Sequence, residues 1–277
     1  MGQCLVTKLK STVSDPDNKL VKLGEMDIVL VGRTLHSIGL QQGDKITAIE
    51  GRFTIGSFST PGQEELTTYT FPTTDYYYIW PSTDKVTIRI SNKYNLTRIH
   101  GNVELKTSDV IYSNINYIDV TGKVEGNLSD IIKGSSTIIY FSIISDYIHG
   151  DLSEVGSIVF ADNSQTFKLG YENSFAENNI TGTLSSLPHT LERCNITLMG
   201  NITGSLTDLG WYRGGSLKLS ATKVRATDAE ITAFLNAVWD SGNGKTSDSM
   251  RLVVKKDDET MFNNLIDFTS SGWTIRQ

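Results

Sequence analysis

Four histidines are the residues of this chain best suited to metal or acid–base chemistry, and they are scattered along it: His36, His100, His149 and His189. Two of them, His100 and His149, occupy the same position of a repeated segment, directly before a glycine. They are two repeats apart, which corresponds to roughly 10 Å if successive repeats stack at the spacing of β-strands. That separation is too long for two ligands of one metal ion. The spacing therefore predicts no metal site and places these histidines in solvent-facing loops.

A cysteine nucleophile and a pair of carboxylates are the other catalytic arrangements to consider. Cys194 follows His189 closely, but its place in an alternating apolar run predicts a buried and inert thiol. A glycoside hydrolase needs two carboxyl groups roughly 5–10 Å apart, and Asp119, Asp151 and Glu154 are candidates if they share a curved surface. The chain contains no HExxH, P-loop, GxSxG or GxGxxG motif. We therefore expect a protein that is not an enzyme and that needs no cofactor.

Tyr76, Tyr77, Tyr78 and Trp80 form an aromatic cluster. Such a cluster is suited to stacking on sugars or to anchoring a protein interface. The alternative is that it seals the boundary between two domains. Because side chains alternate along a strand, neighbouring tyrosines point to opposite faces, so at least one of them lies outside the local core. These four residues are our candidate binding interface.

Composition and charge narrow the class of protein. The chain has 277 residues, of which 24 are glycine and 38% are hydrophobic, as is typical of a β-rich protein with many turns. The net charge is −6 and Lys and Arg form no cluster, so we expect no nucleic-acid partner. No stretch approaches the roughly 18 apolar residues of a membrane span. The first residues lack the apolar run of a signal peptide, so neither a membrane partner nor export is expected.

A short pattern, Ile/Val-x-Gly-x-Leu/Val, recurs through the middle of the chain. Its five copies are Ile99–Val103, Val124–Leu128, Ile148–Leu152, Ile180–Leu184 and Ile202–Leu206. Their glycines are separated by 25, 24, 32 and 22 residues. An alternating apolar run precedes each copy, as in Cys194-x-Ile196-x-Leu198. This arrangement predicts one half-buried strand per repeat, followed by a tight turn at the glycine.

Repeats of this length predict a parallel β solenoid over residues 83–224, because one coil cannot bury its apolar face without neighbours. The segment Leu191–Leu206 follows the leucine-rich-repeat pattern, with Asn201 as the turn residue that bonds the backbone of the coil. A right-handed β-helix and a chance recurrence of the pattern stay as alternatives. Residues 86 to about 220 should form one parallel sheet. The side chains predicted to stack inside it are Ile118, Phe141, Leu169, Ile196 and Leu217.

Residues 1–82 have a different pattern, which is typical of a small antiparallel β domain. A turn is predicted at Asp15–Asn18. The predicted strands include Leu5–Leu9, Asp27–Val31, Lys45–Ile49, Arg52–Ile55 and Tyr76–Trp80.

Residues 225–277 predict an α/β cap that shields the open end of the repeats. A helix should follow the capping box Thr227–Glu230 and stop before Ser241. A second helix is predicted from Asp257, with Phe262, Leu265 and Ile266 on one face. The predicted strands of this region are Met250–Val254 and Trp273–Ile275.

Three parts of the chain carry a family resemblance. The opening Cys4–Lys10, followed by Leu23–Met26, resembles the start of virion proteins from phages and prophages of gut Bacteroidales, including crAss-like phages. Those proteins often continue into irregular leucine-rich-like repeats of the form Ile-Thr-Gly-x-Leu, matched at Ile180–Leu184 and Ile202–Leu206. They also tend to end in a segment similar to Ala226–Arg276. The resemblance implies a head fibre, a capsid decoration or a tail-associated protein.

We therefore expect a non-enzymatic structural protein of the virion, assembled in the cytoplasm of the bacterial host. The resemblance implies docking through the N-terminal domain onto other capsid or tail proteins, or onto copies of the same chain. The repeats would then face a protein or a glycan of the host surface. Two alternatives stay open: a secreted leucine-rich-repeat adhesin of a gut bacterium, which needs an export signal, and a polysaccharide depolymerase on a β-helix, which needs converging carboxylates.

Overall fold

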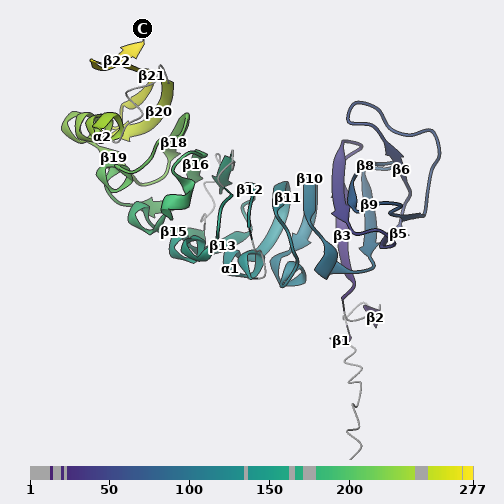
Figure 1. The fold of residues 1–277 in the computed structure, drawn as a ribbon. Helices are drawn as coiled ribbons and strands as arrows, with labels where there is room; N and C mark the ends of the chain where they lie inside the picture. Colours follow the sequence, from purple (N-terminus) through teal and green to yellow (C-terminus); the bar gives the residue numbers. More distant parts are fainter. Residues whose placement is uncertain are drawn as a thin grey trace, which may run out of the picture.

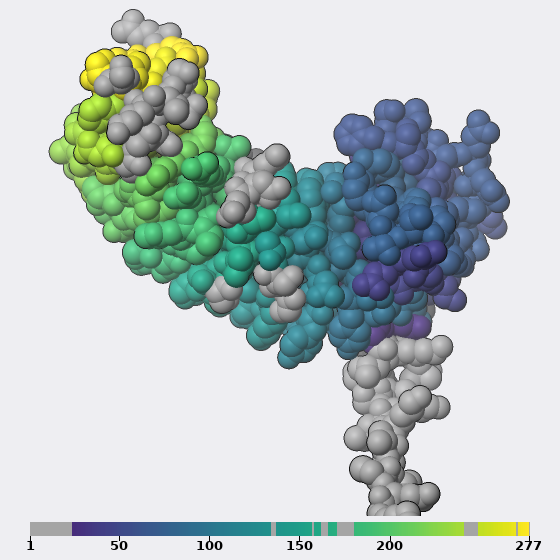
Figure 2. Space-filling model, in the orientation of Figure 1, coloured from purple at the N-terminus to yellow at the C-terminus, as the bar shows by residue number. Residues whose placement is uncertain are grey.

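The computed structural model describes residues 13–14, 20–21, 24–133, 137–161, 166–170, 179–240, 249–269 and 271–276. The protein is mainly β, and within these described ranges twenty strands belong to one hydrogen-bonded mixed sheet. Antiparallel strands lie at the N-terminal end, parallel strands cross the middle, and helix α2 and a hairpin lie at the other end (Figure 1). These parts form one arc that is hollowed between its two ends (Figure 2). Among the described residues, no helix is long and apolar enough to cross a membrane.

The N-terminal antiparallel region confirms four of the predicted strands, while Leu5–Leu9 and the turn at Asp15–Asn18 lie outside the described residues. Two groups of three strands pair antiparallel. In the first group β9 pairs with both β3 and β5, and in the second group β8 pairs with both β4 and β6. The short strand β7 pairs with β5, and β1 pairs with β2. The bounds are β1 Val13–Ser14, β2 Leu20–Val21, β3 Met26–Val31, β4 His36–Leu40, β5 Lys45–Glu50, β6 Phe53–Gly56, β7 Thr68–Thr70, β8 Asp75–Pro81 and β9 Lys85–Ile90. The antiparallel pairing thus runs past residue 82 to Ile90.

A parallel ladder continues the sheet through the middle of the chain. It runs from β10 through β11, β12, β14, β16 and β18 to β20. The bounds are β10 Arg98–Lys106, β11 Tyr117–Asn127, β12 Tyr140–Ile144, β14 Thr166–Leu169, β16 Asn195–Met199, β18 Ser216–Ala221 and β20 Ser249–Lys256. The parallel order is as predicted, but it begins at Arg98 instead of residue 86, because β9 pairs antiparallel with β3 and β5. On its other edge β10 pairs antiparallel with β3 and β4, which joins the two regions.

The predicted interior row of this ladder exists with one change. Its members pair in register and are fully buried: Ile118, Phe141, Phe167, Ile196 and Leu217. Leu169 was predicted in this row and is also buried, but it pairs with Leu198 in the next row. Phe167 takes its place because β14 pairs with its neighbours in a register that sets it between Phe141 and Ile196, and its ring stacks on Phe141 with 5.3 Å between ring centroids.

Three of the repeats contribute a second strand, so the prediction of one strand per repeat is wrong for them, whereas β10 and β11 are single long strands. Strands β13 (Ile148–Asp151), β15 (Asn179–Thr183) and β17 (Asn201–Thr203) pair in parallel, and β13 also pairs with the end of β11. The last four glycine segments form this second ladder, because their backbone groups find partners in the same segment of the next repeat, whereas Ile99–Val103 lies within β10. Asn201, predicted as a turn residue, lies in β17 and pairs with Thr181.

The repeated glycines allow the chain to bend between the two ladders. Gly126 has a φ of +123° and Gly182 one of +115°, a region that side chains obstruct. A Cβ atom on Gly126 would lie 2.2 Å from Thr107 Oγ1, so the predicted need for glycine is confirmed there. Short helices lie in the connections between strands: η1 Lys93–Asn95, η2 Thr107–Val110, α1 Leu128–Ile132, η3 Leu152–Ser157, η4 Leu184–Ser186, η5 His189–Leu191 and η6 Leu206–Leu209. Figure 1 shows α1, β13 and β15 along the outer side of the curve.

The predicted capping box starts helix α2 (Asp228–Asp240). Thr227 Oγ1 accepts the Glu230 N–H at 3.1 Å, and Glu230 Oε2 accepts the Thr227 N–H at 2.9 Å. The helix ends at Asp240, as predicted. The residues it buries are Ile231, Phe234, Leu235 and Val238.

The predicted second helix is wrong. Asp257 belongs to a turn, and β21 (Met261–Thr269) follows, paired antiparallel with β20 and with β22 (Gly272–Arg276). The apolar spacing at Phe262, Leu265 and Ile266 fits a helix, but β20 offers an edge whose hydrogen bonds this segment satisfies. Two asparagines in the segment also weaken the helical alternative.

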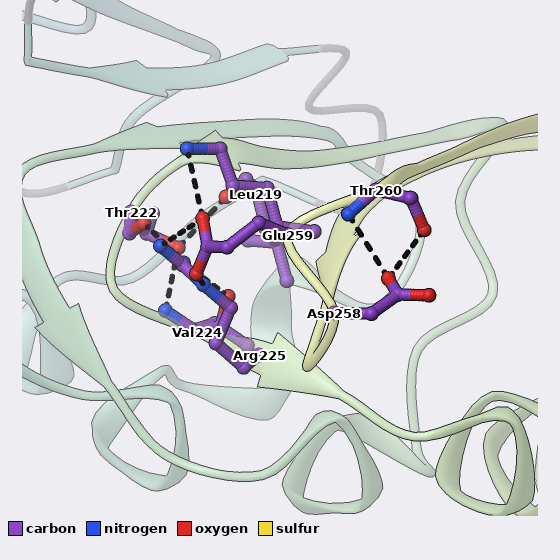
Figure 3. A network of polar contacts seen from close by, with 8 residues as sticks. Leu219, Thr222, Val224, Arg225, Asp258, Glu259 and Thr260 are labelled. Atoms are coloured by element: carbon purple, nitrogen blue, oxygen red, sulfur yellow. Dashed lines mark hydrogen bonds and ion pairs between the residues drawn. The ribbon is translucent and has the colours of Figure 1, made fainter.

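Glu259 fastens this turn to the end of the parallel ladder (Figure 3). Its φ is +63°, a left-handed backbone conformation that residues other than Gly, Asn and Asp seldom adopt. Its carboxylate accepts hydrogen bonds from Arg225 Nε at 2.6 Å and Nη2 at 3.2 Å, and lies 3.7 Å from Lys255 Nζ. Arg225 belongs to β19 (Arg225–Ala226) and also donates to the carbonyl oxygens of Thr222 and Val224. The ion pairs thus hold the hairpin in place.

Candidate binding surface

Strand β8 divides the predicted aromatic cluster between its two faces. The Tyr77 ring packs inward, with its centroid 5.0 Å from that of Phe71 and 5.3 Å from that of Tyr69. Tyr76, Tyr78 and Trp80 alternate with Tyr77 along the strand and lie on the other face. The expectation that adjacent tyrosines point to opposite faces is confirmed.

The outward part of this cluster includes a residue that the sequence did not suggest. Phe58 is 68% exposed and its ring lies 5.8 Å from that of Tyr78. The Tyr76 ring is 5.6 Å from that of Tyr78, and Tyr76 is 41% exposed. Trp80 is half-buried and donates from Nε1 to the Ser57 carbonyl at 3.2 Å.

Arg98, the first residue of the parallel ladder, connects this cluster to the repeats. Its guanidinium carbon lies 4.2 Å from the centroid of the Tyr76 ring and 3.6 Å from that of Tyr117. Gly39 makes this contact possible, because it pairs with Tyr76 on one side and with Arg98 on the other. A Cβ atom on Gly39 would lie 2.9 Å from Arg98 Cβ and 2.6 Å from Thr97 Oγ1. The arginine side chain therefore reaches across the glycine to Tyr76.

The Tyr117 ring stacks on Tyr140 of the next strand, with 4.7 Å between centroids and 17° between planes. Tyr76, Arg98, Tyr117 and Tyr140 thus form one continuous line of ring and guanidinium contacts, which we name the tyrosine–arginine row. Tyr117 and Tyr140 are half-buried, and burial is the main cause that raises the pKa of both phenols. Both tyrosines therefore stay neutral and keep hydroxyl groups that donate hydrogen bonds.

A second line of side chains runs beside the first on the same face of the sheet, two residues further along each strand. Its members pair in register: Ser37, His100, Asp119, Ser142 and Lys168. We name this line the polar row. His100 Nδ1 lies 3.1 Å from Asp119 Oδ2, and the Arg98 Nε–H donates to Ser37 Oγ at 2.8 Å. Ser37 and Ser142 are buried, so the polar row adds the partly exposed groups of His100, Asp119 and Lys168 to the aromatic rings and the guanidinium.

The Asp119→Asn substitution is expected to lower stability near neutral pH but to matter less in acid. Burial raises the pKa of Asp119, but hydrogen bonds from His100 and Ser142 outweigh burial and hold that pKa below its usual value. Because the folded pKa is the lower one, the carboxylate contributes stability above the unfolded pKa of about 3.9. That contribution is lost as the pH falls through the folded pKa. Urea unfolding at several pH values measures the difference between wild type and variant, which should narrow below about pH 4.

The matched control is Asp257→Asn, since Asp257 is exposed in the β20–β21 turn. It should show no comparable difference from wild type at any pH. A difference for Asp119→Asn that stays constant as the pH falls would contradict the role given to this carboxylate.

The remaining histidines are not gathered in one place. His36 is fully buried, with Nδ1 2.9 Å from the Thr34 carbonyl and Nε2 2.8 Å from the Asn102 carbonyl, and burial lowers its pKa. His100 is a strand residue paired with Asp119, so its placement in a solvent-facing loop was wrong. His149 is exposed in β13, and the ring of His189 stacks on Trp211 at 4.8 Å.

Cys194 is buried, as predicted, and burial raises the pKa of its thiol to about 11. A hollow of about 370 Å³ lies beside His189. Among the described residues, Cys194 is not one of those that line it. The structure therefore does not assemble a cysteine–histidine nucleophile from these two residues.

The three candidate carboxylates have separate tasks. Asp119 belongs to the polar row on the first ladder, whereas Asp151 ends strand β13 of the second ladder. Asp151 and Glu154 form the capping box of η3, in which Asp151 Oδ1 accepts the Ser153 N–H at 2.9 Å. No group of three potential metal ligands occurs in the described part of the chain.

The sequence contained a signal for the two rows, which appears when the strands are aligned by their buried residue. Arg98-Ile99-His100, Tyr117-Ile118-Asp119 and Tyr140-Phe141-Ser142 then superpose, and the flanking residues form the rows.

Comparison with known proteins does not identify the chain: no family model, no curated protein and no solved structure matches it.

Proposed function

We propose that this chain is a non-enzymatic binding protein of a phage particle, whose contact surface is the face that carries the tyrosine–arginine row and the polar row. The observation that carries the proposal is the unbroken series of contacts from Tyr76 through Arg98 to Tyr140, which spans the antiparallel region and the repeats. Aromatic residues and arginine are the side chains enriched where proteins bind partners. The resemblance of the sequence to virion proteins of Bacteroidales phages supports the particle as the setting.

The finer architecture proposed for the repeats is an irregular, leucine-rich-like parallel solenoid. The parallel order of strands and the in-register interior row support a solenoid. The second ladder weighs toward the β-helix alternative, because three of the repeats supply two strands. In either form, side chains alternate along each strand of the first ladder, so every second side chain lies outside the core.

Attachment to the particle is assigned to the N-terminal region, with other capsid or tail proteins or copies of the chain as partners. Tyr76 and Arg98 belong to the contact surface, which its own partner would occupy. Attachment to the particle would therefore use a different side of the N-terminal region, the one formed by β3, β9 and β5. Removing the region up to Lys85 is not a clean test, since it deletes the strands β3 and β4 that pair with β10. Full-length chains are therefore needed.

The proposal predicts that the full-length protein is found in phage particles. Mass spectrometry of a density-banded phage preparation should detect the chain in a fixed ratio to the major capsid protein, and the ratio should survive a second banding. Loss of the chain on rebanding, or its recovery from the surface of uninfected cells, would contradict the proposal and favour the secreted adhesin. Release of reducing ends from a capsular polysaccharide by the purified chain would favour the depolymerase.

A further inference from the structure

We propose that Arg98 and the side chains around it bind the carboxylate of an acidic sugar chain, such as a uronic-acid polysaccharide. This inference rests on the proposed function and names the class of ligand that the contact surface takes. It concerns the guanidinium group, which the structure holds in place on both sides.

The guanidinium is fixed before any ligand arrives. It lies between the rings of Tyr76 and Tyr117, and its Nε–H donates to Ser37 Oγ. Contacts of a cation with two aromatic faces are favourable and leave the edge of the guanidinium plane open for hydrogen bonds. A donor group that is already oriented loses little conformational entropy on binding.

Within the described chain, this arginine forms no ion pair with a carboxylate. Its neighbour Asp119 is held by His100, at 3.1 Å, and by a hydrogen bond from Ser142. Arginines elsewhere on the surface do form such pairs, as Arg89 does with Asp27 and Arg276 with Asp267. The side chain of Arg98 also hydrogen-bonds Tyr117, and its charge acts on Asp119. Because a guanidinium has five N–H donors, Arg98 keeps donors for a carboxylate beside its hydrogen bonds to Ser37 and Tyr117.

The surroundings favour a sugar over a peptide as the carrier of that carboxylate. Tyr76 exposes aromatic surface beside the arginine, and Phe58 exposes more of it beyond Tyr78; the C–H face of a pyranose ring can pack on such surface. In the polar row, Ser37 and Ser142 are buried, but the half-buried His100 and Lys168 offer imidazole and amino groups to sugar hydroxyls on the adjacent line. The rows repeat at the strand spacing of about 4.8 Å, close to the length of one sugar unit, so an extended chain can follow the sheet.

The test uses the full-length protein and two matched ligands, a galacturonic acid hexamer and the same hexamer with its carboxyl groups reduced to hydroxymethyl groups. Calorimetry should detect binding of the acidic hexamer and at least about tenfold weaker binding of the reduced one. Arg98→Lys keeps the charge but loses the planar fork, and should weaken binding of the acidic hexamer about tenfold. Arg33→Gln, at an exposed arginine paired with Asp84, should leave binding unchanged.

A second pair of variants guards against loss of folding in Arg98→Lys. Thr166 is half-buried and pairs with Tyr140 at the end of the tyrosine–arginine row. Thr166→Glu should weaken binding by repulsion of the carboxylates, whereas Thr166→Gln should not. Equal binding of the two hexamers, or unchanged binding by both Arg98→Lys and Thr166→Glu, would overturn the proposal.

Two further outcomes are informative. Binding of hexaglutamate as tight as that of the acidic hexamer would show that the site reads charge alone and would overturn the assignment to sugars. Absence of binding by a chain that is present in banded particles would refute this inference and leave the proposed function standing.

Discussion

Replacing Ile196 by Asp is expected to unfold the parallel ladder. Ile196 is fully buried in the interior row, between Phe167 and Leu217. An unpaired carboxylate there has no counter-charge, so the substitution should cost at least about 4 kcal/mol from the lost apolar burial and the buried charge together. That is a large share of the roughly 5–15 kcal/mol that stabilises a typical domain. Urea unfolding followed by circular dichroism should show a strongly lowered midpoint or no folded baseline.

The loss should spread to neighbouring repeats, because each repeat is held by the strands on either side of it. Asn195→Asp is the matched control, since it places the same carboxylate one residue earlier, on the exposed side of β16. This control should keep a midpoint close to that of the wild type. Similar midpoints for the two variants would show that Ile196 is not in the core.

Gly182→Ala is the second substitution from which we expect a large effect. Gly182 has a φ of +115°, and a Cβ atom there would lie 2.9 Å from both the backbone nitrogen and the Cβ of Leu152. Strained backbone of this kind costs about 1–3 kcal/mol, and a clash with backbone cannot be relieved by a rotamer change. We expect a total loss of about 3 kcal/mol or more in the free energy of unfolding.

Two other glycines separate the effect of backbone strain from that of the clash. Gly43 has a φ of +87° with nothing within 4 Å of an added Cβ atom, so Gly43→Ala should cost about 1–2 kcal/mol from the backbone alone. Gly156 lacks a positive φ, and an added Cβ would meet Ser186 O at 3.7 Å, an ordinary contact. Gly156→Ala should therefore leave stability nearly unchanged. If Gly182→Ala cost no more than Gly43→Ala, the close approach of successive repeats at Gly182 and Leu152 would be refuted.

Local patterns in the sequence determined much of the secondary structure. The alternation around Ile118, Ile196 and Leu217 predicted buried strand residues, and the Thr227–Glu230 capping box located the start of α2. Both signals come from interactions within a few residues, so they survive without knowledge of the partners. The repeated glycines were likewise visible, because a bend with positive φ excludes most other residue types.

Partners distant in sequence decided the rest of the fold. Residues 261–269 have an apolar spacing that fits a helix, yet they form β21 because β20 supplies hydrogen-bonding groups along its edge. The second ladder was missed for a similar reason: its strands are as short as Asn201–Thr203, too short for alternation to be recognised. The register that replaced Leu169 by Phe167 in the interior row depends on ring stacking between repeats.

The candidate surface was likewise predictable from the sequence only in part. The sequence by itself determined that Tyr76 and Tyr78 lie on one face of a strand and Tyr77 on the other, because side chains alternate. Only the tertiary structure decided that Arg98 reaches Tyr76, since that contact requires β4 to bring Gly39 between the two strands. A glycine that is unremarkable in the sequence opens the path for the guanidinium, and strand pairing over dozens of residues places it there. Contacts of that range depend on the assembled sheet, so no local pattern encodes them.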